Sequence, residues 1–208
     1  MTKSIDDLRD IYSTIMGEIK LRSEVIENTL GMKSLMGIGP RCELCWLQLR
    51  MICECIALAC LAAHGDLAAT RTKKLHSAYE ADRILRALEK LLPKFFPIPA
   101  RQIKTREGKV TGYLEAVPGT FLTKTDILKL YWECSSHLHK KPLGEFEVFH
   151  VLANEPKKIQ AINTKLRGTL AQHRIILSTP DESLWVEMHG GPAGKVKTAL
   201  VWYGPEKT

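Results

Sequence analysis

Hydrophobic residues recur at every third or fourth position over long stretches of the chain, which predicts amphipathic helices. From residue 5 to about residue 30 only Arg22 interrupts this spacing, and Ser4 with Asp7 forms a variant capping box at its start. Residues 41–64 contain no proline or glycine and are apolar on nearly every side, as expected of a helix at the centre of a bundle. Further helices are predicted over residues 75–93, 123–139 and 155–170.

Shorter runs with alternating polarity predict strands in the rest of the chain. Residues 102–116 alternate around a central glycine and predict a β-hairpin, and three β-like runs after residue 172 predict an antiparallel meander. The sequence therefore predicts an α+β fold that is predominantly α, a helical bundle with a small C-terminal antiparallel β-sheet. Residues 1–142 form the bundle with the inserted hairpin, and residues 143–208 add a helix and three strands that pack on it as one compact unit.

Composition is that of a globular protein: of 208 residues, 45% are hydrophobic and 25% are charged. The first residues lack the apolar core of a secretory signal. The most apolar run, residues 51–63, is shorter than the roughly 20 residues that cross a bilayer. We therefore expect a cytoplasmic protein without a membrane partner.

The net charge of +7 is unevenly distributed along the chain. Residues 1–66 hold 7 basic and 9 acidic residues, residues 67–142 hold 15 and 7, and residues 143–208 hold 8 and 7. We predict that the basic middle third binds RNA or another polyanion, with Phe95 and Phe96 as stacking planes if they are exposed. The alternative is a solvated basic helix face. The predicted contact residues are Lys73, Lys74, Arg83, Arg86, Lys90, Lys94, Arg101 and Lys104.

A row of charges lies in the otherwise apolar second helix. Glu43, Arg50 and Glu54 fall within about 40° of one another around its axis. Since an unpaired buried charge is costly, we predict that they meet Arg22 of the first helix in a buried network of two acids and two bases. Such a network can fix the helix register, line a homodimer interface or belong to an active site.

The helix predicted over residues 123–139 carries candidate catalytic residues. Tyr131, Ser135 and His139 share one face, whereas His137 points elsewhere. Histidine transfers protons near neutral pH, and a hydroxyl one turn away can orient it. These three residues with Arg50 form the candidate catalytic site. The alternative is that His139 only caps the helix.

Six cysteines raise the question of metal binding. Cys42 and Cys45 match the CxxC pattern of a zinc half-site, with Cys53 close in sequence. In one continuous helix Cys42 and Cys53 would be about 16 Å apart, too far to share one ion. We predict no metal and no other cofactor. Small buried thiols are expected, and a redox-active Cys42–Cys45 pair at a helix start is the alternative.

The long helical pair with inward polar residues, followed by a helix that ends in SSHLHKKP, resembles the HEPN class of bacterial helical bundles over residues 1–140. The family motif is arginine, four to six residues, then histidine, and Arg71-Thr-Lys-Lys-Leu-His76 fits that spacing. The positions before His137 where the family places its arginine hold other residues.

The resemblance implies a protein related to metal-independent ribonucleases of toxin and defence systems. For cleavage, His139 or His76 would be the acid or base, and Arg50 or Arg71 would stabilise the phosphate. The missing arginine implies a non-cleaving member. The leading hypothesis is therefore a HEPN-like protein that binds or regulates RNA or another polyanion. The alternatives are a homodimeric interaction module and a small-ligand protein with a pocket between the bundle and the β appendage.

Overall fold

A computed structural model describes residues 4–31, 37–70, 72–103, 113–119, 121–139, 154–179 and 181–202, without the side chains of Lys74, His76 and Tyr113. The fold is α+β and predominantly α, as predicted. The helices are α1 (Ile5–Gly31), α2 (Ile38–Ala63), α3 (Lys73–His76), α4 (Ala81–Leu91), α5 (Lys124–Leu138) and α6 (Glu155–Leu170). The strands are β1 (Ile98–Ile103), β2 (Tyr113–Ala116), β3 (Gln172–Ile176), β4 (Glu182–Glu187) and β5 (Lys197–Trp202).

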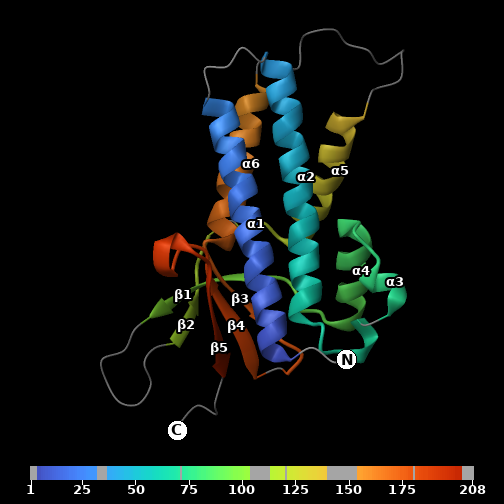
Figure 1. Ribbon diagram of the computed structural model, residues 1–208, viewed down its shortest axis with the longest axis vertical. Coiled ribbons are helices and arrows are strands. Elements are labelled where there is room, and N and C mark those ends of the chain that lie inside the picture. The colour runs from blue at the N-terminus through green and yellow to red at the C-terminus, as the bar shows by residue number, and fades with distance from the viewer. Residues whose placement is uncertain are drawn as a thin grey trace.

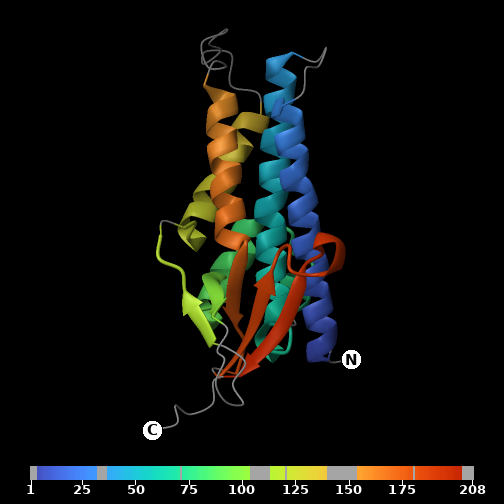
Figure 2. The same ribbon diagram turned by 90° about the vertical axis from the view of Figure 1, so that its left-hand side faces the viewer.

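The long helices stand side by side along the long axis of the molecule, and the sheet lies at the end where α1 begins (Figures 1 and 2). The short helices α3 and α4 pack at the same end of α2, on the side away from the sheet in Figure 1. Helix α2 contacts α1, α4, α5 and α6, so it is the central element of the bundle.

Helix α2 is apolar on nearly every side, and neighbouring helices cover most of these sides. Its buried residues include Cys45, Leu49, Ile52 and Ile56. By length and hydropathy alone this helix is also able to cross a membrane, a test that the core helix of a compact bundle passes as well.

Capping residues define two helix starts that the sequence predicted. The Ser4 hydroxyl accepts from the Asp7 backbone N–H, and the Asp7 carboxylate accepts from the Ser4 N–H. Thr123 and Asp126 form the same reciprocal pair at the start of α5. Hydrogen bonds from Thr123 lower the pKa of the Asp126 carboxyl.

The prediction of one helix over residues 75–93 is wrong, because the structure has two helices there, α3 and α4. Leu75 and Ile84 are both buried, but nine residues of continuous helix would place them about 180° apart. The break after Ser77 allows both side chains to face the core.

The predicted hairpin belongs to the same sheet as the three C-terminal strands. The five strands are antiparallel in the order β2-β1-β3-β4-β5. Strand β1 pairs with β3 through Ile98 with Arg174 and Pro99 with His173. The C-terminal strands therefore form a five-stranded sheet with the hairpin. The boundary predicted at residue 142 lies outside the described residues.

Two buried histidines connect the helices to the sheet. The Tyr12 hydroxyl of α1 lies 2.7 Å from Nε2 of His173 in β3, and the other ring nitrogen lies 2.9 Å from the Leu170 carbonyl. His64, at the end of α2, has its ring nitrogens 2.7 Å from the Cys60 carbonyl and 2.9 Å from the Ile176 carbonyl. Both ends of the bundle–sheet contact are thus fixed by directional bonds.

Candidate functional site

Arg50 of α2 is the centre of a polar cluster with α5. Its Nε lies 3.3 Å from the Glu54 carboxylate, and its Nη2 donates to the Tyr131 hydroxyl at 2.9 Å. Its Nη1 donates to the Ser135 hydroxyl, and the guanidinium carbon lies 4.6 Å from the centre of the Tyr131 ring. The structure therefore brings together Arg50, Tyr131 and Ser135, three of the four predicted catalytic residues.

His139, the fourth, does not join this cluster. It is exposed at the C-cap of α5, where its backbone N–H donates to the Ser135 carbonyl at 3.1 Å. Within the described part of the chain, no contact joins its ring to Arg50. The neighbouring His137 does point elsewhere, because it stacks on Trp46 with ring centres 4.0 Å apart. The cluster thus contains hydroxyls and a cation without an adjacent acid–base histidine.

Acidic neighbours make the Arg50 cluster a poor phosphate site. Burial raises the pKa of the Tyr131 phenol; the Arg50 charge opposes this, whereas the carboxylates of Glu54, Asp82 and Glu80 add to it. A phosphate approaching Arg50 would meet these same negative charges. The arrangement favours Arg50 as a link that fixes the position of α5 on α2.

The predicted network of two acids and two bases is wrong for Arg22 and Glu43. Arg22 donates to Glu18, one turn earlier on α1, and to the Gln48 side chain at 2.9 Å. Gln48 and Arg50 are two residues apart, about 200° around α2, so Arg22 lies on the opposite side of that helix from Arg50. Glu43 is exposed. Only Arg50 and Glu54 pair as predicted.

The six cysteines are all buried, as expected of small core thiols. Cys42 and Cys45 lie inside α2, whose first residue is Ile38, so they are not at the helix start that a redox pair prefers. Burial raises the pKa of Cys45 to about 11, which keeps it protonated and unreactive at neutral pH.

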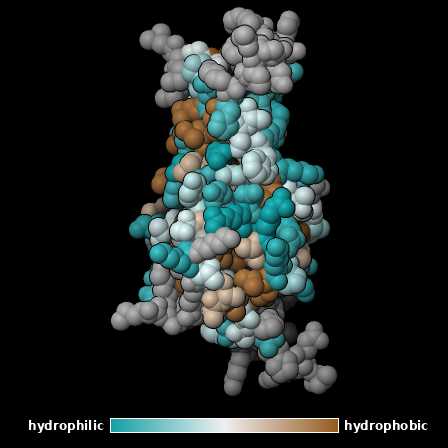
Figure 3. Space-filling view, turned by 90° about the vertical axis from the view of Figure 1, so that its right-hand side faces the viewer, coloured by the Kyte–Doolittle hydropathy of each residue, from teal (hydrophilic) through white to brown (hydrophobic). Residues whose placement is uncertain are grey.

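The basic surface is partly neutralised by the protein's own carboxylates. Arg83 lies 3.7 Å from Glu80, and Arg101 lies 2.8 Å from Glu115 across the β1–β2 pair. Phe95 is buried, so its ring is not available for stacking on a base. The ring of Phe96 packs edge-on against the ring of Phe95. The remaining exposed cations are Lys73, Arg86, Lys90 and Lys94. Figure 3 shows hydrophilic side chains across the middle of the face that carries α4 and α5.

Several predicted contacts lie outside the described residues. These are Arg71, Lys104 and the side chains of Lys74 and His76. The Arg71–His76 motif therefore has no described geometry.

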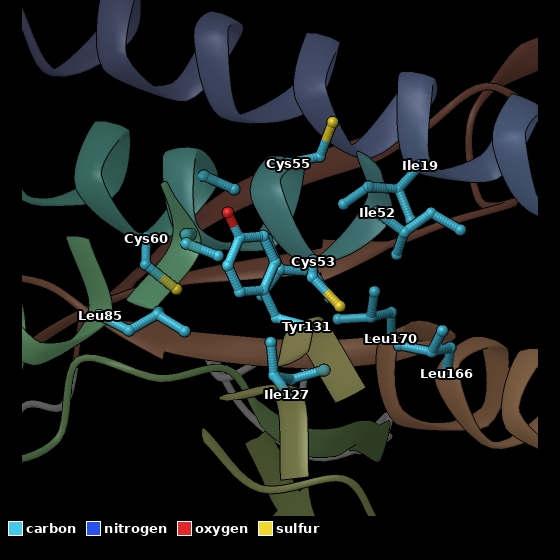
Figure 4. Packing of buried hydrophobic residues seen from close by; sticks show 14 of the residues in the cluster. Ile19, Ile52, Cys53, Cys55, Cys60, Leu85, Ile127, Tyr131, Leu166 and Leu170 are labelled. Carbon is cyan, nitrogen blue, oxygen red and sulfur yellow. The ribbon is translucent and has the colours of Figure 1, made fainter. Parts of the chain in front are cut away.

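A cavity of about 380 Å³ lies between α1, α6 and the end of β4. Its floor consists of apolar side chains from three helices, and Figure 4 shows Ile19, Ile52, Leu166 and Leu170 converging there. Met188, which follows β4, adds a flexible thioether to the lining. The volume is in the range of about 300–1,000 Å³ that small-molecule sites occupy.

Polar residues surround the mouth of this cavity. Each of them belongs to α1, to α6 or to the turn after β4. They are Lys20, Ser23, Glu24, Thr164, Arg167 and His189. Ser23 is satisfied internally, since its hydroxyl donates to the Asn163 side chain at 2.8 Å. Gly168 also lies at the mouth, and a Cβ added there would meet no atom within 4 Å.

Sequence reasoning named this location only in general terms, as a pocket between the bundle and the β appendage. The floor residues have the same helical spacing as ordinary core residues, and the mouth combines segments about 165 residues apart. One residue of the sequence could have indicated this site. Gly168 is an isolated glycine inside a predicted helix, where glycine lowers helix stability and its presence indicates a packing or functional role.

Comparison of the chain with models of protein families, with curated proteins and with solved structures finds no match. The resemblance to the HEPN class stays a prediction.

Proposed function

We propose that this protein binds a small, largely apolar ligand in the cavity between α1, α6 and β4. The observation that carries the proposal is a cavity of ligand size with an apolar floor and a polar mouth. Ile52 and Leu170 on the floor are each at most 2% exposed, so the cavity extends into the core of the bundle.

The cavity lies between helices of the bundle, at the point where the sheet joins them, and the space between bundle helices is a usual position for ligand sites. Helix α6 leads directly into β3, and the Met188 backbone N–H donates to the Ala171 carbonyl at 3.0 Å. This bond holds the turn after β4 against the end of α6. The walls are therefore parts of a fixed framework, which reduces the entropy lost on binding.

Filling the mouth of the cavity should weaken binding. We expect Gly168→Leu to weaken the binding of n-decanol, a probe of about the right size, by at least about tenfold, measured by titration calorimetry. The matched control is Gly17→Leu on α1, where an added Cβ also meets no atom within 4 Å and the gain in helix propensity is the same. No saturable binding to the wild type, or equal binding to both variants, would contradict the proposal.

A second candidate function is polyanion binding, as predicted from the charge distribution. It is supported by Arg86, Lys90 and Lys94, which are exposed along or just after α4 and have no ion-pair partner among the described residues. In this interpretation the protein is a non-cleaving, HEPN-like regulator in the cytoplasm.

Reversing those three charges should weaken RNA binding and make it less sensitive to salt. With Arg86, Lys90 and Lys94 changed to Glu, the slope of log K against log salt should fall by about 0.7 for each lost phosphate contact to a single strand. The control reverses Lys157, Lys165 and Lys195 instead, which changes the net charge equally on other surfaces. If both triple variants lose affinity equally, binding is nonspecific and α4 is not the site.

A further inference from the structure

We infer that the ligand carries a protonated amine and that the Glu24 carboxylate binds it at the mouth of the cavity. The inference rests on the proposed function and adds the chemical class of the ligand. The charged groups at the mouth differ in whether they already have partners within the protein.

Both cations at the mouth are engaged. The Lys20 ammonium donates to the Gly194 carbonyl at 2.6 Å, which holds it toward the connection between β4 and β5. The Arg167 guanidinium is ion-paired with Glu27 on α1. An anionic head group would have to displace one of these bonds before it gained a cationic partner.

Glu24, in contrast, is available. It is half-buried on α1, one turn after Lys20, and no donor contacts its carboxylate within the described part of the chain. A carboxylate that faces a cavity and has no protein partner gives up no hydrogen bond within the protein when it accepts one from an ammonium group. Such charge-assisted bonds are shorter and stronger than neutral ones.

The end of α6 favours the same sign of charge. Arg167, Gly168 and Ala171 on the lining belong to the last turn of this helix and its cap, where the negative end of the helix dipole lies. The dipole acts there even though the Leu170 and Ala171 carbonyls already accept hydrogen bonds from His173 and Met188. A cation at the mouth is therefore attracted by Glu24 and by the negative end of α6. Of the two cations that would oppose it, Arg167 is balanced by Glu27 and the Lys20 ammonium is held toward Gly194. The His189 ring can donate or accept, so it does not discriminate between head groups.

The size of the cavity limits the apolar part of the ligand. A volume of about 380 Å³ is near the lower end of the range for small-molecule sites, so it favours a small ligand. The expected ligand is therefore an amine with an aliphatic or aromatic body of this size, whose body lies on Ile19, Ile52 and Leu170.

Three probes with the same chain and different head groups test the inference: n-decylamine, n-decanol and n-decanoate. Binding is measured by calorimetry at pH 7 and at concentrations below micelle formation. We expect the amine to bind the wild type about fivefold more tightly than the alcohol, with decanoate the weakest. Glu24→Gln should lower the affinity for the amine to about that for decanol, so that the preference for the amine disappears.

Two controls separate the possible failures. Asp10→Asn removes an exposed carboxylate of α1 outside the cavity and should keep the preference. Gly168→Leu should weaken all three probes. If decanoate binds most tightly, or if Glu24→Gln leaves the preference intact, the amine inference is wrong while the cavity remains a site. If no probe binds in a way that Gly168→Leu weakens, the proposed function fails and the inference fails with it.

Discussion

Replacing Trp46 with alanine should lower the free energy of unfolding by about 3–5 kcal/mol. Trp46 is 2% exposed in α2 and joins three helices. Its ring stacks on His137 of α5 with an interplanar angle of 5°, and its indole N–H donates to the Glu155 carboxylate of α6 at 2.9 Å. The substitution removes this packing and leaves the buried Glu155 carboxylate without its donor, which adds a desolvation cost.

The matched control is Trp132→Ala on α5. Trp132 is 54% exposed, so its loss should cost less than about 1 kcal/mol. Trp46→Phe should fall between the two, because it keeps an aromatic ring but loses the indole donor and part of the buried ring volume. Urea unfolding followed by circular dichroism measures all three. Similar losses for Trp46→Ala and Trp132→Ala would show that α2, α5 and α6 do not depend on this contact.

Acidification from pH 7 to pH 4 should cost about 3 kcal/mol of stability through His173 alone. Burial lowers the pKa of His173 to about 4 from the ordinary 6.5, while its bond to the Leu170 carbonyl opposes this. A carbonyl only accepts, so Nδ1 carries the proton, and Nε2 accepts from the Tyr12 hydroxyl. Burial raises the pKa of Tyr12, so that hydroxyl stays protonated.

The sign follows from proton uptake by the unfolded chain. Between pH 6.5 and pH 4, His173 binds a proton when the protein is unfolded and not when it is folded, so stability falls as the pH falls. At pH values above this window the contribution is constant. Urea unfolding at several pH values between 6.5 and 4.5 should show a shallower slope for His173→Gln than for the wild type.

His189→Gln serves as the control for this pH series, because His189 is exposed and should leave the slope unchanged. Identical slopes for the wild type and His173→Gln would assign the acid sensitivity to other groups.

Local sequence patterns correctly predicted the features that depend on a single helix, such as which residues share one of its faces. The spacing of four residues placed Tyr131 and Ser135 on one face of α5, and both contact Arg50 there. The same arithmetic could not say which helix each face of α2 meets. Arg22 therefore received the wrong partners, since it packs beside Gln48 on the side of α2 away from Arg50.

Local sequence patterns also could not predict that the third helix is divided in two. No proline or glycine marks residues 77–80, and the break follows from the need to bury Leu75 and Ile84 on one side. Local sequence patterns could not predict the residues that line the cavity either, for a related reason. Its walls are apolar residues with ordinary core spacing, and only the tertiary arrangement leaves space between them.

The pairing of β1 with β3 decides how this chain can be divided. A protein that ended between α5 and α6 would keep β1 and β2 but lose β3, so Ile98 and Pro99 would lose their strand partners Arg174 and His173. Tyr12 would lose His173 in the same cut. Open strand edges of this kind associate with other chains. Residues 1–142 and 143–208 should therefore aggregate when each is produced alone, and fragment complementation by co-expression should restore soluble protein.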